Sequence, residues 1–342
     1  MLNSFGSMNV HLAIPDLLWP HREPPSATAS GRLVALEQLF ARGRRAHVSA
    51  TNLEQWLIGA WHAAGGAAAY ALLADGGEPG DGIWVRADPC HLRVDRAELT
   101  LVDTSLFDLS REEAEALVES LNRHFAHRGL AFCPMLPERW YVRVDALEPI
   151  ESPPLAAVRG KPVEAQERVA SWHALTNEIQ MLLHEHPVNQ AREGRGELTV
   201  NSIWFSGGGR LIAPAAKPFR RVRANNPLAA GLARASATAM LPLPGSGGEW
   251  LRASASEGVE LIVLDSLSAP LSYGDQATWR DRVAALDRDW LAPLLDALRA
   301  GRIGMLTLHA IGSDRTIDVE ATRQDLRYFW RRTKPLSTYA AQ

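Results

Sequence analysis

A strand, helix, strand order in the last third of the chain places the strongest constraint on its fold. Residues 260–264 and 303–309 are short apolar runs, and residues 279–298 between them carry apolar side chains at helical spacing. This order predicts a parallel pair of strands joined by a right-handed crossover. Another apolar run, residues 10–14, leads into Pro15 and Asp16 and predicts a buried strand with an acid at its carboxyl end, where ligands bind in such sheets. The sequence therefore predicts an α/β protein with a mainly parallel central sheet flanked by helices.

The middle of the chain has a different order of elements. Residues 83–94 and 99–102 predict a β-hairpin, and Ser110 with Glu113 forms a capping box that opens a helix to about residue 127. Residues 130–133 and 139–144 predict two more strands, and several prolines follow. The segment 81–147 is therefore predicted to fold as a small α+β unit. Downstream, we expect a helix over 169–185 that ends before Pro187, and a strand over 201–205.

Composition argues against several classes of partner and location. The chain has 36 basic and 39 acidic residues and a formal charge of −3, whereas nucleic-acid-binding proteins usually carry a clear basic excess. Basic clusters at 42–45, 217–223 and 331–334 are interpreted as solvated faces or helix ends. Cys90 and Cys133 lack CxxC spacing, and the first basic residue, Arg22, comes too late for a secretory signal. We expect a cytoplasmic protein with no nucleic-acid partner.

One charge-free stretch requires comparison with a membrane span. Residues 55–74 contain no Asp, Glu, Lys or Arg. They are mostly alanine and glycine, and Gly65 and Gly66 interrupt them, which favours a buried helix followed by a turn. We expect no membrane partner.

Generic catalytic motifs are absent from the sequence, including the dinucleotide, P-loop, nucleophile-elbow and zinc-protease patterns. The glycine-rich turns at 207–209 and 245–248 are more typical of ordinary turns than of phosphate cradles. His184 and His186 are two residues apart, so they would point in different directions on a helix and not share a zinc ion.

Two longer patterns resemble a known family. The string His186-Pro-Val-Asn189-Gln-Ala-Arg192, with Gly196, Asn201-Ser-Ile-Trp204 and Gly207 to Gly209, is similar to a signature of archaeal-type cofactor-independent phosphoglycerate mutases. The segment from Gly80 to Asp88 resembles the entry to the inserted lid domain of those mutases, with an arginine near the phosphosugar. Weaker similarity extends over most of the chain and includes residues 13–16, 33–43 and 273–290. A closer resemblance is to the bacterial RpfE-type regulatory proteins, which share WPHREP, LLADGGEPGDGIWVRADPCHL, NEIQMLLHEHPVN and RIGMLTLH.

The resemblance implies a discontinuous alkaline-phosphatase-like core, residues 1–80 and 148–342, with an inserted α+β lid domain at 81–147. It also implies specific metal and nucleophile positions. Such mutases hold two divalent metals and pass phosphate through a Ser or Thr. Asp16 matches the first acid, Ser49 and Thr51 lie near the nucleophile position, and Asp265 and His309 are the remaining metal candidates. Leu308 stands where the acid of the final Asp-His pair is expected, and Leu271 and Ser272 stand where a histidine is expected. These departures predict that no dimetal centre forms and that no cofactor is needed, since hard cations require several oriented ligands.

The phosphosugar side of the family pattern is better retained. Arginine binds phosphate or carboxylate bidentately, and neighbouring polar groups supply further hydrogen bonds. The ligand-binding candidates are Arg86, Asp88, His91, His186, Asn189, Arg192 and Asn201. The alternative at each position is a structural role, such as a turn cap or an Arg86–Asp88 pair.

Three functions follow from this sequence. The favoured one is a degenerate, non-catalytic relative of phosphoglycerate mutase that binds a small phosphorylated or anionic ligand in a regulatory role. The first alternative is an active mutase or phosphatase with an altered Mn, Zn or Mg site. The second is a protein-interaction module with a protein partner, because the chain has 11 tryptophans, which are enriched at interfaces.

Overall fold

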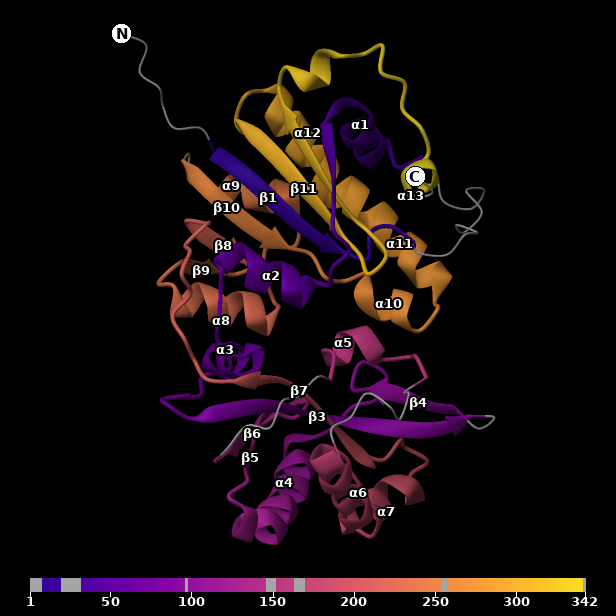
Figure 1. Cartoon of the computed structure of the whole chain (residues 1–342). Coiled ribbons are helices and arrows are strands. Elements are labelled where there is room, and N and C mark those ends of the chain that lie inside the picture. The colour runs from indigo at the N-terminus through magenta and orange to yellow at the C-terminus, as the bar shows by residue number, and fades with distance from the viewer. Residues whose placement is uncertain are drawn as a thin grey trace. The chain divides into compact units, whose positions relative to one another are not determined.

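A computed structural model describes residues 8–19, 32–95, 98–145, 152–162, 170–253 and 257–340. Most of the WPHREP string lies outside the described residues. The chain divides into two compact units (Figure 1). Residues Met1–His62 and Ala215–Gln342 form one, here called the core unit, and residues Ala63–Pro214 form the other, here called the inserted unit.

The core unit is built on a seven-stranded, mainly parallel sheet, which confirms the predicted fold class. Its strands in spatial order are β2 (Arg44–Val48), β12 (Thr316–Thr322), β11 (Met305–Ile311), β1 (Met8–Pro15), β10 (Gly258–Val263), β8 (Arg221–Arg223) and β9 (Ala239–Leu241). The strands from β11 to β9 are parallel, and β12 and β2 add an antiparallel edge. The predicted crossover joins β10 to β11. These two strands are parallel but not adjacent, because β1 lies between them.

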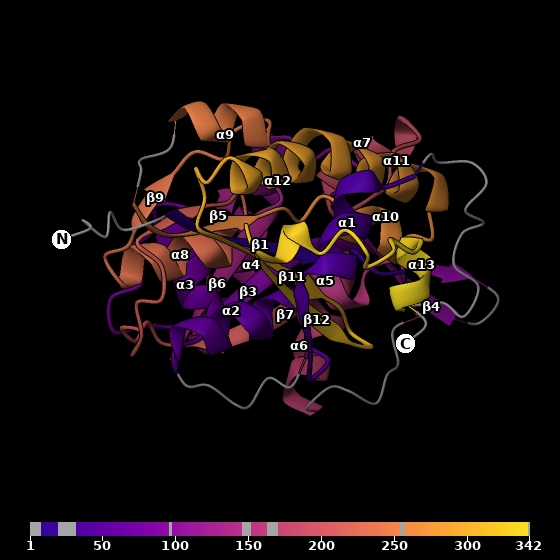
Figure 2. The ribbon, with the colours of Figure 1, turned by 90° about the horizontal axis from the view of Figure 1, so that it is seen from above.

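Helices cover both faces of this sheet (Figure 2). One face carries α1 (Val34–Arg42), α9 (Gly247–Ala253), α11 (Gln276–Leu286), a π-helical turn (Asp287–Leu291) and α12 (Ala292–Arg299). The other face carries α2 (Leu53–Trp61) and α8 (Pro227–Ala235). Shorter helices are α10 (Ser268–Ser272), a 3-10 turn (Asp325–Arg327) and α13 (Leu336–Ala340).

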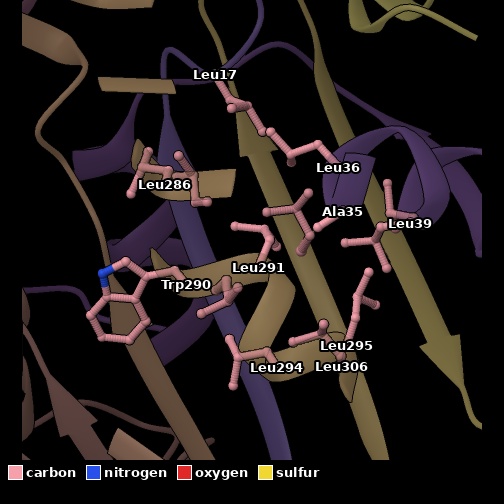
Figure 3. Close-up of a cluster of buried hydrophobic side chains, with 14 of the residues drawn as sticks. Leu17, Ala35, Leu36, Leu39, Leu286, Trp290, Leu291, Leu294, Leu295 and Leu306 are labelled. Atoms are coloured by element: carbon pink, nitrogen blue, oxygen red, sulfur yellow. The ribbon is translucent and has the colours of Figure 1, made fainter. Parts of the chain in front are cut away.

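The main hydrophobic core lies between the sheet and the first helical layer. Leu36 and Leu39 of α1 pack with Leu291, Leu294 and other leucines of the π turn and α12 over Leu306 of β11 (Figure 3). Alternate residues of β1, including Leu12 and Ile14, belong to the same cluster. Because side chains alternate along a strand, the residues between them, His11 and Ala13, face α2.

The inserted unit has its own antiparallel sheet. Strand β3 (Ile83–Asp95) is central and pairs with β4 (Glu98–Asp103), β6 (Arg139–Val144) and β7 (Ser202–Gly209), and β5 (Ala131–Leu136) pairs with β6. Its helices are α3 (Ala67–Ala74), α4 (Arg111–Phe125) with a 3-10 turn (Ala126–Arg128), α5 (Leu155–Val158), α6 (Ala170–His184) and α7 (Pro187–Gly194). Helix α4 begins at the predicted Ser110–Glu113 capping box. Helices α4 and α6 close a second hydrophobic core against the sheet.

The structure departs from the sequence expectations in three places. The compact unit spans 63–214 and not 81–147, because β7 pairs with β3 and α6 completes its core. The charge-free stretch forms two helices, α2 and α3, because α2 ends at its C-cap residue His62, which has a left-handed φ of 47°. Gly66 precedes α3 and packs against Gly209, since a Cβ on Gly66 would lie 2.4 Å from the Gly209 nitrogen. The basic cluster at 42–45, interpreted as a solvated face or helix end, spans the end of α1 and the start of edge strand β2, whose side chains are all exposed and therefore give no apolar pattern.

Among the described residues, none of the helices has the length and hydrophobicity that crossing a bilayer requires.

Candidate functional site

Three of the predicted metal and nucleophile positions lie at one edge of the core sheet. The Asp16 backbone N–H donates to the Ile311 carbonyl at 2.8 Å, and the Thr51 N–H donates to the Gly312 carbonyl at 3.1 Å. Leu264 N–H donates to the Ala13 carbonyl, so Asp265 leaves β10 at the same level. These backbone contacts bring Asp16, Thr51 and Asp265 to the carboxyl ends of β1, β11 and β10, where α/β sheets bind ligands.

Backbone geometry is unusual at Asp16. Its φ is 61°, in the left-handed region, and the Trp279 indole N–H donates to its carbonyl at 2.9 Å. Aspartate tolerates this conformation better than most residues. The Thr51 hydroxyl lies 3.2 Å from Gln55 Oε1, at the start of α2, and Ser49 is exposed one residue after β2. The candidate nucleophiles therefore sit in the connection between β2 and α2.

His309 takes part in a hydrogen-bonded array with His11 and Asp318. Its Nδ1 lies 2.8 Å from Asp318 Oδ1, and its Nε2 lies 2.9 Å from His11 Nδ1. The two imidazole rings are stacked at 5.2 Å, and the Trp56 ring of α2 lies 4.7 Å from His309. Residues His309 and Asp318 are direct cross-strand neighbours on β11 and β12, which fixes this pair. Both nitrogens of the His309 ring are therefore engaged by protein groups.

Burial controls the charge of this array. Desolvation, with repulsion from His309, lowers the pKa of His11 to about 4, and Asp318 only partly opposes this shift. His11 is therefore neutral at pH 7. The arrangement is satisfied when the Nδ1–H of His309 donates to Asp318 and the Nδ1–H of His11 donates to His309 Nε2, an assignment that follows from the hydrogen-bond network. The array holds His309 in one tautomer and one orientation.

The predicted metal ligands do not fit a two-metal centre in this arrangement. A metal ligand needs an available lone pair, and His309 directs one nitrogen to Asp318 and the other to His11. In the part of the chain that the structure describes, no group of three or more His, Cys, Asp or Glu side chains is arranged to hold a metal ion. Asp275, in the late segment of the family pattern, caps α11 by accepting from Thr278 N–H, and hydrogen bonds from the Thr278 side chain and N–H lower its pKa.

Arg86 and Asp88 of β3 form an ion pair inside the inserted unit. Arg86 Nη2 lies 2.5 Å from Asp88 Oδ1, and Arg86 Nε also donates to both carboxylate oxygens. Asp88 is buried, which raises its pKa, and the Arg86 charge opposes that shift. The Arg86 side chain is 20% exposed and its guanidinium lies 5.8 Å from the Tyr141 ring centroid.

The other predicted ligand-binding residues hold the segment that leads into β7. Arg192 Nε donates to the Leu198 carbonyl, His91 Nδ1 lies 2.9 Å from the Thr199 carbonyl oxygen, and Asn189 bonds both the N–H and the carbonyl of Val200. The Asn201 side chain pairs with the backbone N–H and carbonyl of Leu92. Residues 198–200 lie outside regular structure, and Thr199 and Val200 are buried, so these side chains satisfy backbone groups that no strand partner reaches.

The remaining contacts of these residues are also internal. His186 caps α7 by accepting from Val188 N–H, and its Nε2 lies 3.0 Å from the Ser120 hydroxyl. Burial lowers the pKa of His186. Arg192 pairs with Glu113 at 2.6 Å and donates to the Asp108 carbonyl, and its side chain is 3% exposed. These contacts favour a structural role for the signature residues His186, Asn189 and Arg192.

The glycines of the signature allow close backbone contact. The turn predicted at 207–209 is wrong, because these glycines form the end of strand β7. A Cβ on Gly209 would lie 2.7 Å from the Gly66 Cα, so the end of β7 packs directly on the start of α3. This close packing accounts for glycine on both sides of the contact.

Sequence reasoning did not select His11 or Asp318. The sequence does distinguish His11, because it is the polar residue in the apolar run 10–14. The residues on either side of it, Val10 and Leu12, point into the core. Asp318 lies on β12, a strand that the sequence analysis did not predict.

Comparisons with known proteins bear on the fold of this chain and not on its function. No protein-family model matches the chain, and no curated protein matches it significantly. The PH0037 protein from Pyrococcus horikoshii is 14% identical, with 93% of this chain and 88% of that chain covered and a TM-score of 0.58. A cofactor-independent phosphoglycerate mutase from Thermoplasma acidophilum is 15% identical, with 98% and 94% covered and a TM-score of 0.48. The first pair shares its overall fold, and the TM-score of the second pair is too low to support an argument.

Proposed function

We propose that the chain is a degenerate phosphoglycerate-mutase-like protein that binds a small phosphorylated or anionic ligand and does not carry out metal-dependent phosphotransfer. The observation that carries this proposal is the engagement of both His309 nitrogens by His11 and Asp318. Leu308 stands where the family pattern has an acid, so the final strand offers one imidazole already in use. Sequence resemblance to RpfE-type proteins supports a regulatory role, and the two cysteines without CxxC spacing support a cytoplasmic location.

Arg86 is the best-placed residue for the anion. Its side chain is 20% exposed, compared with 3% for Arg192, so a ligand reaches it with less rearrangement. Asp88 already orients its guanidinium through three hydrogen bonds. Competition with Asp88 favours ligands that carry more than one negative charge.

Metal content tests the loss of phosphotransfer. We expect elemental mass spectrometry of the purified protein to find less than about 0.1 metal per chain, and Mn²⁺, Zn²⁺ or Mg²⁺ to leave the melting temperature unchanged, since a ligand of the folded state raises it. As a matched variant, His309→Gln removes the imidazole and should not change metal content. Stoichiometric metal that His309→Gln or Asp16→Asn removes would contradict the proposal.

Ligand binding requires a separate experiment. A thermal-shift screen of phosphorylated metabolites against the wild type should identify a ligand whose binding Arg86→Ala weakens about tenfold or more. Arg123→Ala is the control, because Arg123 is exposed on α4. The melting temperature of apo Arg86→Ala must be measured too, since the variant leaves the Asp88 charge buried. Failure of every metabolite to shift the wild type would contradict the binding role.

An active metal-dependent mutase or phosphatase is the second candidate. It is favoured by the shared position of Asp16, Thr51 and Asp265 at one sheet edge and by the φ of 61° at Asp16. Residues held in rarely populated backbone conformations cluster at functional sites. This candidate predicts phosphatase or mutase turnover with added Mn²⁺ that Thr51→Ala abolishes and Ser49→Ala does not. Turnover that chelation removes would replace the first proposal with this one.

A further inference from the structure

A basic pocket lies in the core unit, between α1 and the segment 329–335. Its volume is about 550 Å³, within the range of small-molecule sites. Four arginines line it, Arg32, Arg42, Arg331 and Arg332, together with Phe329 and Thr333. The candidate residues discussed above are not among its lining residues.

The arginines of this pocket are held by neutral groups more than by carboxylates. Arg42 Nη1 donates to the Leu326 carbonyl, and Arg331 Nη1 donates to the Arg42 carbonyl, both at 3.0 Å. Arg32 pairs with Glu37 at 2.7 Å and also donates to the Thr333 hydroxyl. Within the described residues, the carboxylate that pairs with these four guanidinium groups is Glu37, and it pairs with Arg32. The pocket therefore keeps a strong positive charge that an anion would neutralise.

Exposed arginines supply the open donors of the pocket. Arg331 and Arg332 are exposed, whereas Arg42 is half-buried and its unpartnered Nε is buried, out of reach of a ligand. Exposed guanidinium forks match phosphate oxygens in geometry and charge.

Exposed aromatic rings stand beside the cations. The side chain of Phe329 is 77% exposed and that of Trp330 is 63% exposed, and their ring centroids are 5.3 Å apart. Arg331 lies over the Tyr328 ring at 4.8 Å. Planar bases stack on such rings, and each stacked base contributes about 1–3 kcal/mol.

We propose that this pocket binds a nucleotide, with its phosphates on the arginine cluster and its base against Phe329. A mononucleotide suits the site better than a nucleic-acid strand, because the four arginines gather at one pocket and the whole chain carries a charge of −3. This site is separate from the proposed ligand position at Arg86, so either proposal can fail without the other.

Calorimetric titration of the full chain at low salt tests the proposal, with ADP, adenosine and pyrophosphate as probes. We expect ADP to bind more tightly than either fragment, because it uses both the cations and the rings. The double variant Arg331→Ala/Arg332→Ala should weaken ADP binding about tenfold or more. Phe329→Ala should weaken ADP binding severalfold and change pyrophosphate binding less than about twofold.

Two further variants separate charge from fold. Arg331→Lys/Arg332→Lys keeps the charge and loses the fork geometry, so ADP affinity should fall between those of wild type and the alanine variant. Arg123→Ala on α4 is the matched surface control and should bind ADP as wild type does. Equal ADP binding by wild type and the double alanine variant would overturn the proposal. So would a single-stranded oligonucleotide that binds more than about tenfold tighter than ADP and loses this affinity in the same variant, because the occupant would then be a polymer.

Discussion

At the scale of single residues, His11 shows how one polar side chain in an apolar strand organises a site. Strand alternation places it on the α2 face, where it meets His309 and the Phe219 ring at 5.4 Å. Since the surroundings desolvate the ring, the protein holds His11 neutral and uses it as a hydrogen-bond partner for His309.

The pH dependence of stability follows from His11. Its pKa in the folded protein is about 4, below the ordinary 6.5, so the unfolded chain binds more protons between these values. The contribution of His11 to the free energy of unfolding is therefore complete above pH 6.5. It is lost as the pH falls toward 4, a change of about 3 kcal/mol. Urea unfolding of His11→Gln should show a shallower decline of the unfolding free energy between pH 6.5 and 4. The exposed His184→Gln should keep the wild-type slope, and an unchanged slope for His11→Gln would contradict the assignment.

The signature residues form a family-like pattern in the sequence, and the structure shows which local contacts these residues make. His186, Asn189, Arg192 and Asn201 hold backbone groups of the inserted unit through the contacts described above. Sequence spacing could not separate this role from anion binding, because the same donors serve carbonyl oxygens and phosphate oxygens. Pairing between Arg86 and Asp88 was anticipated as an alternative, since residues two apart on a strand face the same side.

At the scale of elements, short strands in the core sheet depend on side-chain anchors. Strand β8 has three residues, and its Arg221 and Arg223 both donate to Glu260 of β10, at 2.7 and 2.6 Å. The indole N–H of Trp250 in α9 donates to the same carboxylate at 2.7 Å. Glu260 is fully buried, so one carboxylate ties β8, β10 and α9 together.

Removal of this carboxylate should be strongly destabilising. Glu260→Ala leaves two arginines and an indole without their acceptor, and we expect a loss of about 3–5 kcal/mol in the free energy of unfolding. Glu260→Gln keeps one acceptor oxygen and should lose less. The control is Glu320→Ala, because Glu320 pairs with Arg44 at the exposed sheet edge and should cost less than about 1 kcal/mol. Equal losses at the two positions, measured by urea unfolding, would contradict this account.

The strands and helices with clear periodicity were predictable from the sequence. Strands β1, β3, β4, β5, β6, β7, β10 and β11 and helices α4 and α6 occur within a few residues of the predicted ranges. Strands β2, β8, β9 and β12 were not predicted, because three of them are edge or three-residue strands and their partners decide their conformation. The predicted helix over 279–298 contains a π turn at Asp287–Leu291, which no sequence period signals.

At the scale of the whole molecule, the two units have separate hydrophobic cores. The large cluster around Leu36 and Leu306 uses residues of the core unit, and the cluster around Leu121 and Phe205 uses residues of the inserted unit. The sequence placed the boundary too far inward because prolines after residue 148 suggested an exit. The chain instead continues through α6 and α7 to β7, whose pairing with β3 spans more than a hundred residues and leaves no local pattern.

A fragment of residues 63–214 should therefore fold without the rest of the chain. We expect cooperative urea unfolding and protected amides in β3 and β7. The narrower fragment 81–147 is the matched comparison and should not fold, because it lacks β7 and the Leu175, Ile179 and Leu183 side chains of the second core. A non-cooperative transition for 63–214 would show that its core is insufficient alone.

The position of β1 has a consequence for how the chain is made. Its partners, β10 and β11, are the strands on either side of it, and both are encoded near the C-terminal end. At about 5–20 residues per second, the ribosome needs roughly 12–50 s after β1 to finish β10. During this interval the apolar first strand has been synthesised without either of its neighbours. All of the inserted unit is synthesised before the interval ends. Nascent chains should thus carry a completed inserted unit and an unpaired strand that chaperones are well placed to shield until translation ends.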